Sequence, residues 1–461
     1  MGNRTAFNVD ILGGGLAGLF SAYHLTGAGI PVTVYEEKDR IGGNCVTHAS
    51  GEFRFDSGAH RFHHKDVAST ETMKSLLGDC LRLTDTPSRI YSDRKLVNFP
   101  LSAFNLLKSL GVLGFARSTY QIVRSRLCGP PVAEGDLKRF ATRAYGSEIA
   151  ERFLLNYSEK LWGVTPDRLS SDMARIRLKG LTVQGFLREA LRGAKGEAGH
   201  LDGSFYYPED GIGTIADTLA AVGSATIMTR SRVTGVEHDG RRITSIVLNE
   251  TDRVAVDRVI STIPLPHLLK MMYPPPDRAI MAQVRKLRYR SLILVALFLE
   301  KASVTPDATI YFPDSDFIFT RAYEPRNRGR AMAPPGRTSL VLEVPCDLGD
   351  DKWDMADEDL VGLVLSQLAV TGWIAPGEIL GTEVRRMEHA YPILDMDAVG
   401  ITKLVLGFLD RFSNLTVSGR TGRFTYCSIH DLMKESRDIA LDFVRQSSRM
   451  QGQVVTTEYA N

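Results

Sequence analysis

The chain has 461 residues, 43% hydrophobic and 24% charged, so it can bury a large core and form two or three domains. Its 56 basic and 54 acidic residues give a net charge of +2, which excludes a global field that would draw it to nucleic acid or an anionic membrane. Five scattered cysteines without CxxC spacing argue against a disulfide framework and a zinc site. We therefore expect a soluble enzyme of a reducing cytoplasm.

The sequence shows no segment typical of export or of membrane crossing. The N-terminus leads straight into a predicted strand, so we expect no secretory signal. The most membrane-like stretch, residues 101–123, is interrupted by Lys108, Arg117 and Gln121, so we expect no stable membrane insertion. An amphipathic helix covering a site is the preferred interpretation of this stretch.

The first elements form a β-α-β unit with a glycine turn. Residues 8–12 predict a strand, 16–28 a helix and 31–36 a second strand. In the turn between strand and helix, Gly13 allows a tight bend, Gly15 lets backbone N–H groups approach a diphosphate, and Gly18 lets the helix pack closely on the strand. Glu36, about 20 residues further on, stands where a carboxylate binds ribose hydroxyls. The unit predicts dinucleotide binding.

The remaining elements alternate between helical and sheet regions. Residues 106–191 are predicted mainly helical, followed by a polar, glycine-rich stretch. Predicted strands follow at 226–229, 231–237, 243–248 and 259–263, and then at 292–299, 309–312 and 339–343. Predicted helices cover 357–370 and 430–446.

The same glycine turn could bind NAD, so an NAD-dependent dehydrogenase is the alternative prediction. Two further glycine stretches favour FAD. Gly42 and Gly43 follow the ribose-binding acid, where FAD proteins of the glutathione-reductase type bring backbone near the flavin. Gly419 and Arg420 begin a late stretch before a helix whose N-terminus can receive the flavin end of the cofactor. We therefore predict an α/β fold, with a Rossmann-like FAD-binding domain interleaved with a helical segment and a mixed-sheet substrate domain.

The predicted domains are discontinuous. Residues 1–90, 204–265 and 415–461 are expected to assemble the FAD-binding domain. Residues 91–203 form a mainly helical substrate or lid domain, and residues 266–414 form a sheet-containing substrate domain.

Six sequence blocks carry a family resemblance. They are I-G-G-N at 41–44, G-A-H-R-F-H at 58–63, K-L-W-G-V at 160–164, F-T-R at 319–321, A-Y-P at 390–392 and G-R-T-G-R-F-T-Y at 419–426. In these blocks and their order, the sequence resembles the UDP-galactopyranose mutase family, within the wider amine-oxidase and protoporphyrinogen-oxidase-like FAD superfamily. The match runs discontinuously over most of the chain.

The resemblance implies an isomerase reaction without net redox. In this family, N5 of reduced FAD attacks the anomeric carbon of UDP-galactopyranose or a related nucleotide hexose, and the sugar recloses as a furanose. The implied partners are a nucleotide-sugar substrate and an unidentified electron donor that reduces the flavin.

The resemblance also assigns roles to polar residues. Arg321 and Arg177 fall where the family places diphosphate-binding arginines, with Arg175 as a rival to Arg177 and a structural ion pair as the alternative for each. Tyr391 and Tyr426 correspond to tyrosines whose hydroxyls contact the diphosphate or sugar; core packing is their alternative.

Aromatic residues and one histidine complete the expected site. Phe153 and Tyr157, four positions apart, share a helical face and form either a nucleobase slot or a core stripe. His60 aligns with a histidine beside the flavin, with the Ala59 carbonyl near N5. A metal at His60 and His63 with His64 is disfavoured, because no carboxylate or cysteine set joins these histidines. We expect no metal.

The expected site residues fall into three groups. The catalytic residues are Arg321, Arg177, His60, Tyr391 and Tyr426. The cofactor-binding residues are Gly13, Gly15, Leu16, Ala17, Gly18, Glu36, Glu37, Gly42, Gly43, Asn44, Gly58, Ala59, His60, Val233, Gly419 and Arg420. The substrate-binding residues are Phe99, Phe153, Tyr157, Trp162, Arg177, Arg321, Tyr391 and Tyr426.

Two other functions remain open from the sequence. An FAD-dependent oxidoreductase of the amine-oxidase or protoporphyrinogen-oxidase type shares the glycine turns, but it would need an apolar pocket without diphosphate arginines. A nucleotide-binding scaffold without activity is a third reading, against which the intact spacing of cofactor and sugar blocks argues.

Overall fold

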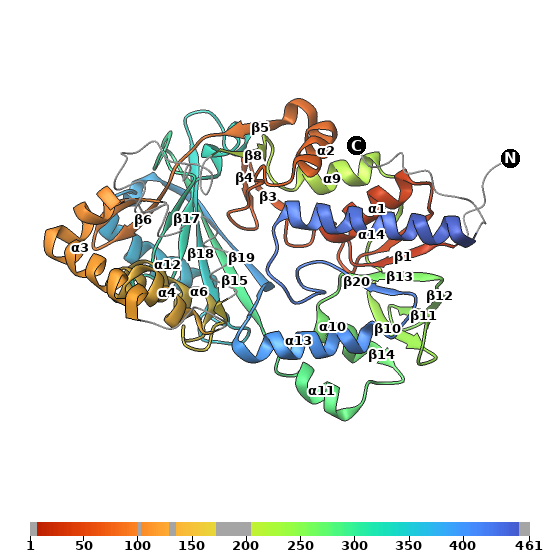
Figure 1. The fold of residues 1–461 in the computed structure, drawn as a ribbon. Coiled ribbons are helices and arrows are strands. Elements are labelled where there is room, and N and C mark those ends of the chain that lie inside the picture. The colour runs from red at the N-terminus through yellow and green to blue at the C-terminus, as the bar shows by residue number, and fades with distance from the viewer. Residues whose placement is uncertain (1–6, 100–102, 129–134, 172–203, 451–461) are drawn as a thin grey trace.

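The computed structural model describes residues 7–99, 103–128, 135–171 and 204–450. Two large sheets lie on opposite sides of the molecule, and a group of helices lies beside the sheet drawn on the left of the view (Figure 1).

The strand before the glycine turn belongs to a sheet that has five parallel strands over the described residues. Across the sheet they are β20 (Leu415–Val417), β13 (Arg258–Ser261), β1 (Val9–Leu12), β2 (Val32–Tyr35) and β9 (Thr226–Met228). The predicted β-α-β unit is confirmed. The fold class is also confirmed, because this parallel sheet is built from segments far apart in the chain.

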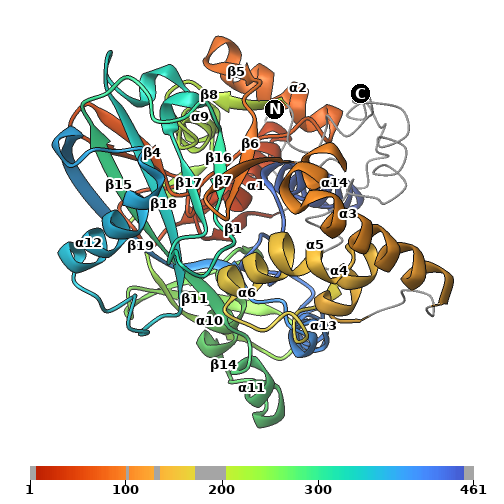
Figure 2. The same ribbon diagram turned by 90° about the vertical axis from the view of Figure 1, so that its left-hand side faces the viewer.

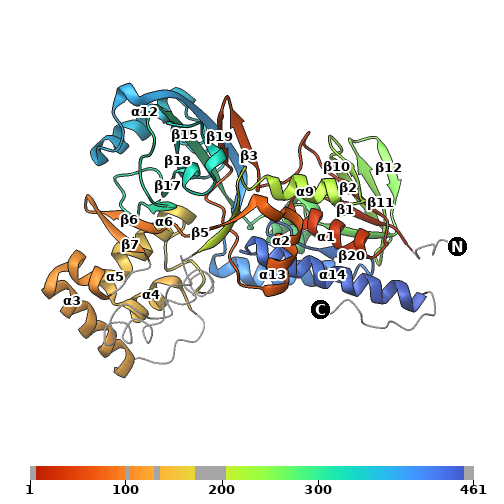
Figure 3. The same cartoon turned by 90° about the horizontal axis from the view of Figure 1, so that it is seen from above.

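Different layers cover the two faces of this sheet. On one face, α1 (Leu16–Gly27) packs against α14 (Ile429–Met450) and α9 (Thr214–Val222). The other face carries α10 (Leu265–Met271) and a smaller sheet (Figures 1 and 3). The strands of that sheet, in order, are β12 (Asp252–Ala255), β11 (Ile243–Leu248), β10 (Val233–His238) and β14 (Met272–Tyr273). The predicted hairpin around residues 238–240 joins β10 to β11 and is confirmed.

A second large sheet has seven strands within the described ranges. In order they are β19 (Ile379–Pro392), β15 (Tyr289–Leu299), β18 (Thr338–Cys346), β17 (Arg321–Tyr323), β16 (Thr309–Tyr311), β6 (Ser88–Ser92) and β7 (Lys95–Phe99). β15 is apolar at nearly every position because both of its faces are buried. Leu292 and Leu294 face the core shared with the nucleotide sheet, whereas Ile293 and Val295 face α12 (Asp357–Leu368).

The helical segment lies beside the end of this sheet that β6 and its edge strand β7 form (Figure 2). It contains α3 (Ala103–Cys128), α4 (Leu137–Tyr145), α5 (Ser147–Ala150), a π-helical turn (Glu151–Leu155) and α6 (Asn156–Trp162). The expected domain boundary at residues 90–91 falls inside β6, and β6 and β7 belong to the seven-stranded sheet. Their partner β16 lies more than 200 residues away, so the local sequence could not place them.

The remaining elements connect these regions. They are β3 (Thr47–Ser50), β4 (Phe53–Asp56), α2 (Val67–Leu77), β5 (Leu81–Thr84), β8 (Phe205–Pro208), α11 (Arg278–Val284) and α13 (Met396–Leu409). In the part of the chain that is described, no helix has both the length and the apolarity that a bilayer crossing requires.

Candidate functional site

The glycine turn brings backbone groups to the start of α1. Gly13 has φ +107°, and a Cβ atom there would lie 2.4 Å from Thr262 Oγ1; a Cβ atom at Gly18 would lie 2.2 Å from the Gly13 carbonyl oxygen. Gly15 caps α1 without a side-chain hydrogen bond, and the first turn, with Leu16 and Ala17, has no acidic residue. These N–H groups suit a diphosphate.

The second glycine loop packs on the first, backbone against backbone. Gly42 N donates to the Gly14 carbonyl at 2.9 Å, and a Cβ atom at Gly43 would lie 3.1 Å from Gly15 Cα. Glu36 faces this turn, because its Oε2 accepts from Gly14 N at 2.8 Å. The two loops and the Glu36 carboxylate fit the diphosphate and ribose of a dinucleotide.

Other expected cofactor residues surround this cradle. Glu37 is exposed beside Glu36, and Val233 begins β10, two residues after Ser231 N donates to the Glu36 carbonyl at 2.8 Å. Asn44 follows the second loop and donates to the His389 carbonyl at 2.8 Å.

The C-terminal block reaches the same end of α1. Gly419 has φ +84°, and a Cβ atom there would lie 3.0 Å from Ala17 Cβ. Arg420 donates to the Cys427 carbonyl from Nε at 3.1 Å and from Nη2 at 2.5 Å. Its guanidinium lies 5.2 Å from the ring centre of Tyr426 and 5.8 Å from that of Tyr391. Arg420 therefore connects the cofactor cradle with the expected substrate tyrosines.

The Gly58-Ala59-His60 loop is held to the seven-stranded sheet. Ala59 N donates to Glu343 Oε1 at 2.8 Å, and Arg328 Nη1 donates to the His60 carbonyl at 2.9 Å. The His60 Nε2 atom is buried and has no hydrogen-bond partner among the residues that the structure describes. Burial, together with the nearby charges of Arg420, Arg321 and Arg328, lowers the pKa of His60 to about 3, so the ring is neutral at physiological pH.

Arg321 is the centre of a buried polar cluster. In the antiparallel pairing of β17 and β18, Arg321 stands directly opposite Glu343, so the two charged side chains meet. Arg321 Nε donates to Glu343 Oε2 at 2.6 Å, and Nη2 donates to the Tyr391 hydroxyl at 2.6 Å and also contacts Glu343. Burial acts to lower the pKa of Arg321, but the Glu343 carboxylate and the neighbouring tyrosine hydroxyls together raise it above its usual value.

Three aromatic rings pack beside Arg321. Trp162 is buried and lies edge-on to Tyr391 and Tyr426, with ring centres 5.7 and 6.1 Å away. The two tyrosine rings are stacked at 6.3 Å. Burial raises the pKa of Tyr391, so its hydroxyl stays protonated. Three sequence blocks predicted separately are thus brought into one cluster.

The glycine after Trp162 allows the chain to turn at the end of α6. Gly163 ends α6 in the left-handed conformation, with φ +63°. A Cβ atom there would lie 2.6 Å from Nη1 of Arg290. The Nε atom of Arg290 donates to the Leu161 carbonyl at 3.1 Å. Lys160 points elsewhere and donates to the Phe312 carbonyl at 2.8 Å. Of this block, Trp162 is the residue whose ring contacts the site tyrosines.

The expected nucleobase residues meet at Tyr311, which sequence reasoning missed. Tyr157 lies edge-on to Tyr311 at 5.7 Å, and Phe99 lies 5.4 Å from the same ring. Phe153 and Tyr157 are both buried, but they contribute to different hydrophobic clusters. The π-helical turn at Glu151–Leu155 includes Phe153, so regular helical spacing does not hold through this segment.

Arg177 and its rival Arg175 lie outside the described residues.

Sequence reasoning missed two charged residues of the site, Glu343 and Arg328. Glu343 sits at the end of a predicted apolar strand, and a single charge in such a run was the available signal. Arg328 had no comparable signal in its loop. Within the described ranges, no group of three or more histidine, cysteine or acidic side chains is arranged to bind a metal ion.

The family profile of flavin-containing amine oxidoreductases matches residues 16–386. The chain belongs to this family. It is an FAD-dependent enzyme, and the glycine cradle is the element that fits its cofactor.

Two oxidoreductases are similar in sequence to this chain. Protoporphyrinogen oxidase 1 of Arabidopsis thaliana is 25% identical over 385 residues, which cover 74% of this chain and 70% of that protein. Phytoene dehydrogenase of Streptomyces griseus is 24% identical over 290 residues, 59% of this chain and 57% of that protein.

Solved structures share the fold. The crystal structure of reduced UDP-galactopyranose mutase superposes with a TM-score of 0.81 at 19% identity, covering 98% of this chain and 97% of that one. Putrescine oxidase bound to putrescine gives a TM-score of 0.62 at 17% identity, covering 95% and 99%. Both similarities concern the fold alone.

Proposed function

We propose that this enzyme is a flavin-dependent nucleotide-sugar mutase that interconverts pyranose and furanose forms of UDP-galactose or a related nucleotide hexose without net redox. The observation that carries the proposal is the set formed by the buried Arg321, Tyr391 and Trp162 and the half-buried Tyr426, next to Arg420 and His60. A diphosphate needs cationic and hydroxyl donors of this kind, whereas an apolar substrate does not.

The cofactor domain is proposed to be assembled from residues 1–90, 204–265 and 415–461, except that β6 belongs to the other sheet. The strands of the five-stranded sheet come from all three segments and support this division. When bound and reduced by an electron donor, FAD supplies an electron-rich N5 atom that can attack an anomeric carbon. The residues of the chain then have to bind, orient and shield the substrate.

Arg321 is proposed to bind the diphosphate of the substrate, together with Arg177. Its Nε and Nη2 atoms face Glu343 and Tyr391, so the carboxylate fixes the guanidinium plane before substrate arrives. Fixed donors cost no reorganisation when negative charge develops on the departing diphosphate. Tyr391, protonated because of its raised pKa, offers a hydroxyl at the same place.

His60 and Trp162 are proposed to shape the flavin side of the site. Neutral His60 places one uncharged imidazole nitrogen in a buried position, where it can exchange a hydrogen bond with cofactor or substrate. Trp162 packs against both tyrosines and excludes water from their rings. Phe99, Tyr157 and Tyr311 are proposed to contact the nucleobase.

An oxidoreductase is the second candidate, and the identity to protoporphyrinogen oxidase and phytoene dehydrogenase favours it. Such an enzyme would accept electrons from its substrate. Under that function, the Arg321–Glu343 pair would be a closed structural ion pair with no ligand.

The deciding experiment incubates dithionite-reduced and oxidised protein with UDP-galactose and a panel of UDP-, dTDP- and GDP-linked pyranoses, followed by chromatography and mass spectrometry. The expected result is a new isomer of equal mass, formed by the reduced protein alone. Flavin that is bound and reducible, with no conversion across the panel, would replace the mutase function with the oxidoreductase.

A further inference from the structure

The outer face of α3 concentrates exposed apolar side chains. Leu113 is 87% exposed, Val112 74%, Tyr120 62% and Val123 47%. Leu113 and Tyr120 stand seven positions apart, and Val123 lies one turn beyond Tyr120, so these three share one side of the helix. Single exposed apolar residues are ordinary, but a row of them on one helix indicates a contact surface.

The opposite side of α3 holds the helix to the protein. Gln121 Oε1 accepts from Ser147 N and from Ser147 Oγ, each at 3.0 Å, and Ser118 and Ile122 are buried. α3 contacts α4, α5 and β7, and it lies at the outer edge of the molecule (Figures 1 and 3). The exposed row therefore faces away from the core and from the proposed active site.

The positive charge of α3 argues against a second copy of the chain as the partner of this face. Between residues 103 and 128 there are four basic residues, Lys108, Arg117, Arg124 and Arg126, and no acidic one, although the whole chain carries only +2. Arg117 and Arg124 are exposed beside the apolar row. In a symmetric dimer through this face, like charges would meet without acidic partners on the helix.

A break in the helix gives the face its shape. Gly111 has φ +71°, so the regular helix is interrupted immediately before Val112 and Leu113. The two most exposed apolar side chains thus stand at the start of the second helical part. An aliphatic row with a tyrosine and flanking arginines has the composition of a helix that lies in the headgroup region of a bilayer.

We propose that the α3 face, made of Val112, Leu113, Arg117, Tyr120, Val123 and Arg124, docks the enzyme on an anionic lipid surface. The helix lies in the interface and does not cross the bilayer. The arginines contact lipid phosphates, and the apolar row enters the boundary of the acyl chains. The surface is independent of the proposed mutase chemistry.

The test measures co-sedimentation of the full-length FAD-bound protein with phosphatidylcholine vesicles, with and without phosphatidylglycerol. We expect binding to the anionic vesicles alone, weakened by salt. The Arg117→Glu/Arg124→Glu variant should have a partition coefficient at least about 30-fold lower, because each basic residue near an anionic surface contributes roughly fivefold. Leu113→Asp should bind at least about 10-fold less, since it places a charge in the apolar row.

Matched controls carry the same substitutions elsewhere. Val399→Asp changes an exposed valine of α13, and Arg241→Glu/Arg411→Glu reverses two exposed arginines on the nucleotide-binding side. Both should bind vesicles like the unchanged protein, and all variants should retain bound flavin. Equal losses in controls and α3 variants, or no binding by the unchanged protein, would overturn the proposal. Light scattering that shows a dimer dissociated by Leu113→Asp, without vesicle binding, would assign the face to a second copy.

Discussion

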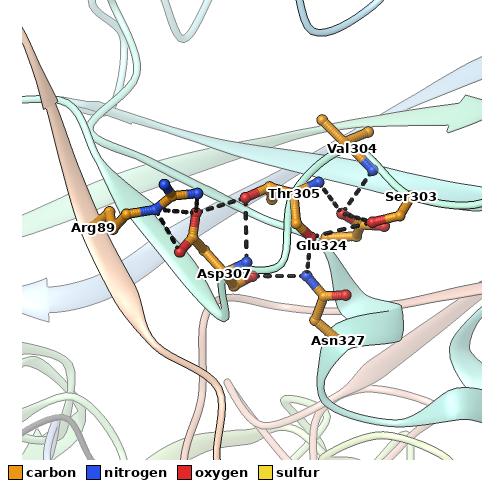
Figure 4. A network of polar contacts seen from close by, with 7 residues as sticks. All are labelled: Arg89, Ser303, Val304, Thr305, Asp307, Glu324 and Asn327. Carbon is orange, nitrogen blue, oxygen red and sulfur yellow. Dashed lines mark hydrogen bonds and ion pairs between the residues drawn. The ribbon is translucent and has the colours of Figure 1, made fainter. Parts of the chain in front are cut away.

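Two ion pairs of the seven-stranded sheet, each with a buried carboxylate, have different surroundings. Arg89 binds Asp307 through both carboxylate oxygens, at 2.6 to 2.9 Å, and Thr305 Oγ1 donates to the same carboxylate (Figure 4). Beside this pair, Oε2 of the Glu324 carboxylate accepts from both Val304 N and Thr305 N. Backbone and side-chain groups of a loop enclose these carboxylates, which indicates a structural role.

The Arg321–Glu343 pair is enclosed in another way. Its neighbours are a tyrosine hydroxyl, the loop with Ala59, and His60, whose Nε2 is buried without a partner among the described residues. Ionic and hydroxyl groups thus gather beside the cofactor cradle and not within a loop. The comparison teaches that burial of a charge pair does not identify a site; the groups left around the pair do.

The largest difference is expected in activity. Arg321→Lys keeps the charge but loses the planar guanidinium, and we expect kcat/KM for nucleotide-sugar isomerisation to fall about 100- to 1,000-fold. Arg89→Lys, the matched change in the structural pair, should leave kcat/KM within about threefold. Steady-state assays of both variants measure the difference. Equal losses would mean that the pairs have the same role.

The two ion pairs should also differ in how far added UDP restores the thermal stability of their variants. Glu343→Gln leaves the buried Arg321 without its carboxylate, and we expect it to lower the free energy of unfolding by about 3 kcal/mol; Asp307→Asn leaves the half-buried Arg89 unpaired and should cost less. UDP should restore much of the Tm of Glu343→Gln, because its diphosphate can compensate Arg321. Asp307→Asn should gain no more from UDP than the unchanged protein. Thermal denaturation with and without UDP tests this, and absence of selective rescue would contradict the assignment.

A smaller effect is expected from Tyr391→Phe. The substitution removes the hydroxyl that accepts from Arg321 at 2.6 Å but keeps the stacked ring, so kcat/KM should fall about 10-fold. Tyr91→Phe, in the core around α12, is the control and should retain activity. A Tyr391→Phe enzyme with full activity would remove this hydroxyl from the site.

The smallest effect concerns pH. The pKa values of seven histidines are lowered, chiefly by burial, including those of His60 to about 3 and His24 to about 4. The unfolded chain binds protons on these rings below about pH 6.5, where the folded protein does not, so stability falls as pH falls. Asp10, with a pKa raised to about 6 by burial, acts in the opposite direction. Tm should decrease between pH 7 and 5; a constant Tm would contradict these shifts.

Sequence reasoning reached the elements whose signals are local. The glycine turn, the hairpin strands β10 and β11 and the apolar strand β15 were predictable because turn residues and hydrophobic runs lie within one segment. β19 was missed as a strand, since its mostly polar residues give no apolar pattern, although Tyr391 at its end was predicted. Glu343 was missed because cross-strand register, set by tertiary pairing, places it opposite Arg321. Tyr311 was missed because the packing of β16 against α6 brings it to Tyr157.

The most direct test of the central claim follows flavin absorbance and product formation together, under anaerobic conditions, with chemically reduced enzyme and UDP-galactose. Isomerisation without net redox predicts many furanose products per flavin while the flavin remains reduced at the end. Oxidation of the flavin in proportion to substrate consumed, or no isomer when a nucleotide sugar is bound, would contradict the mutase account.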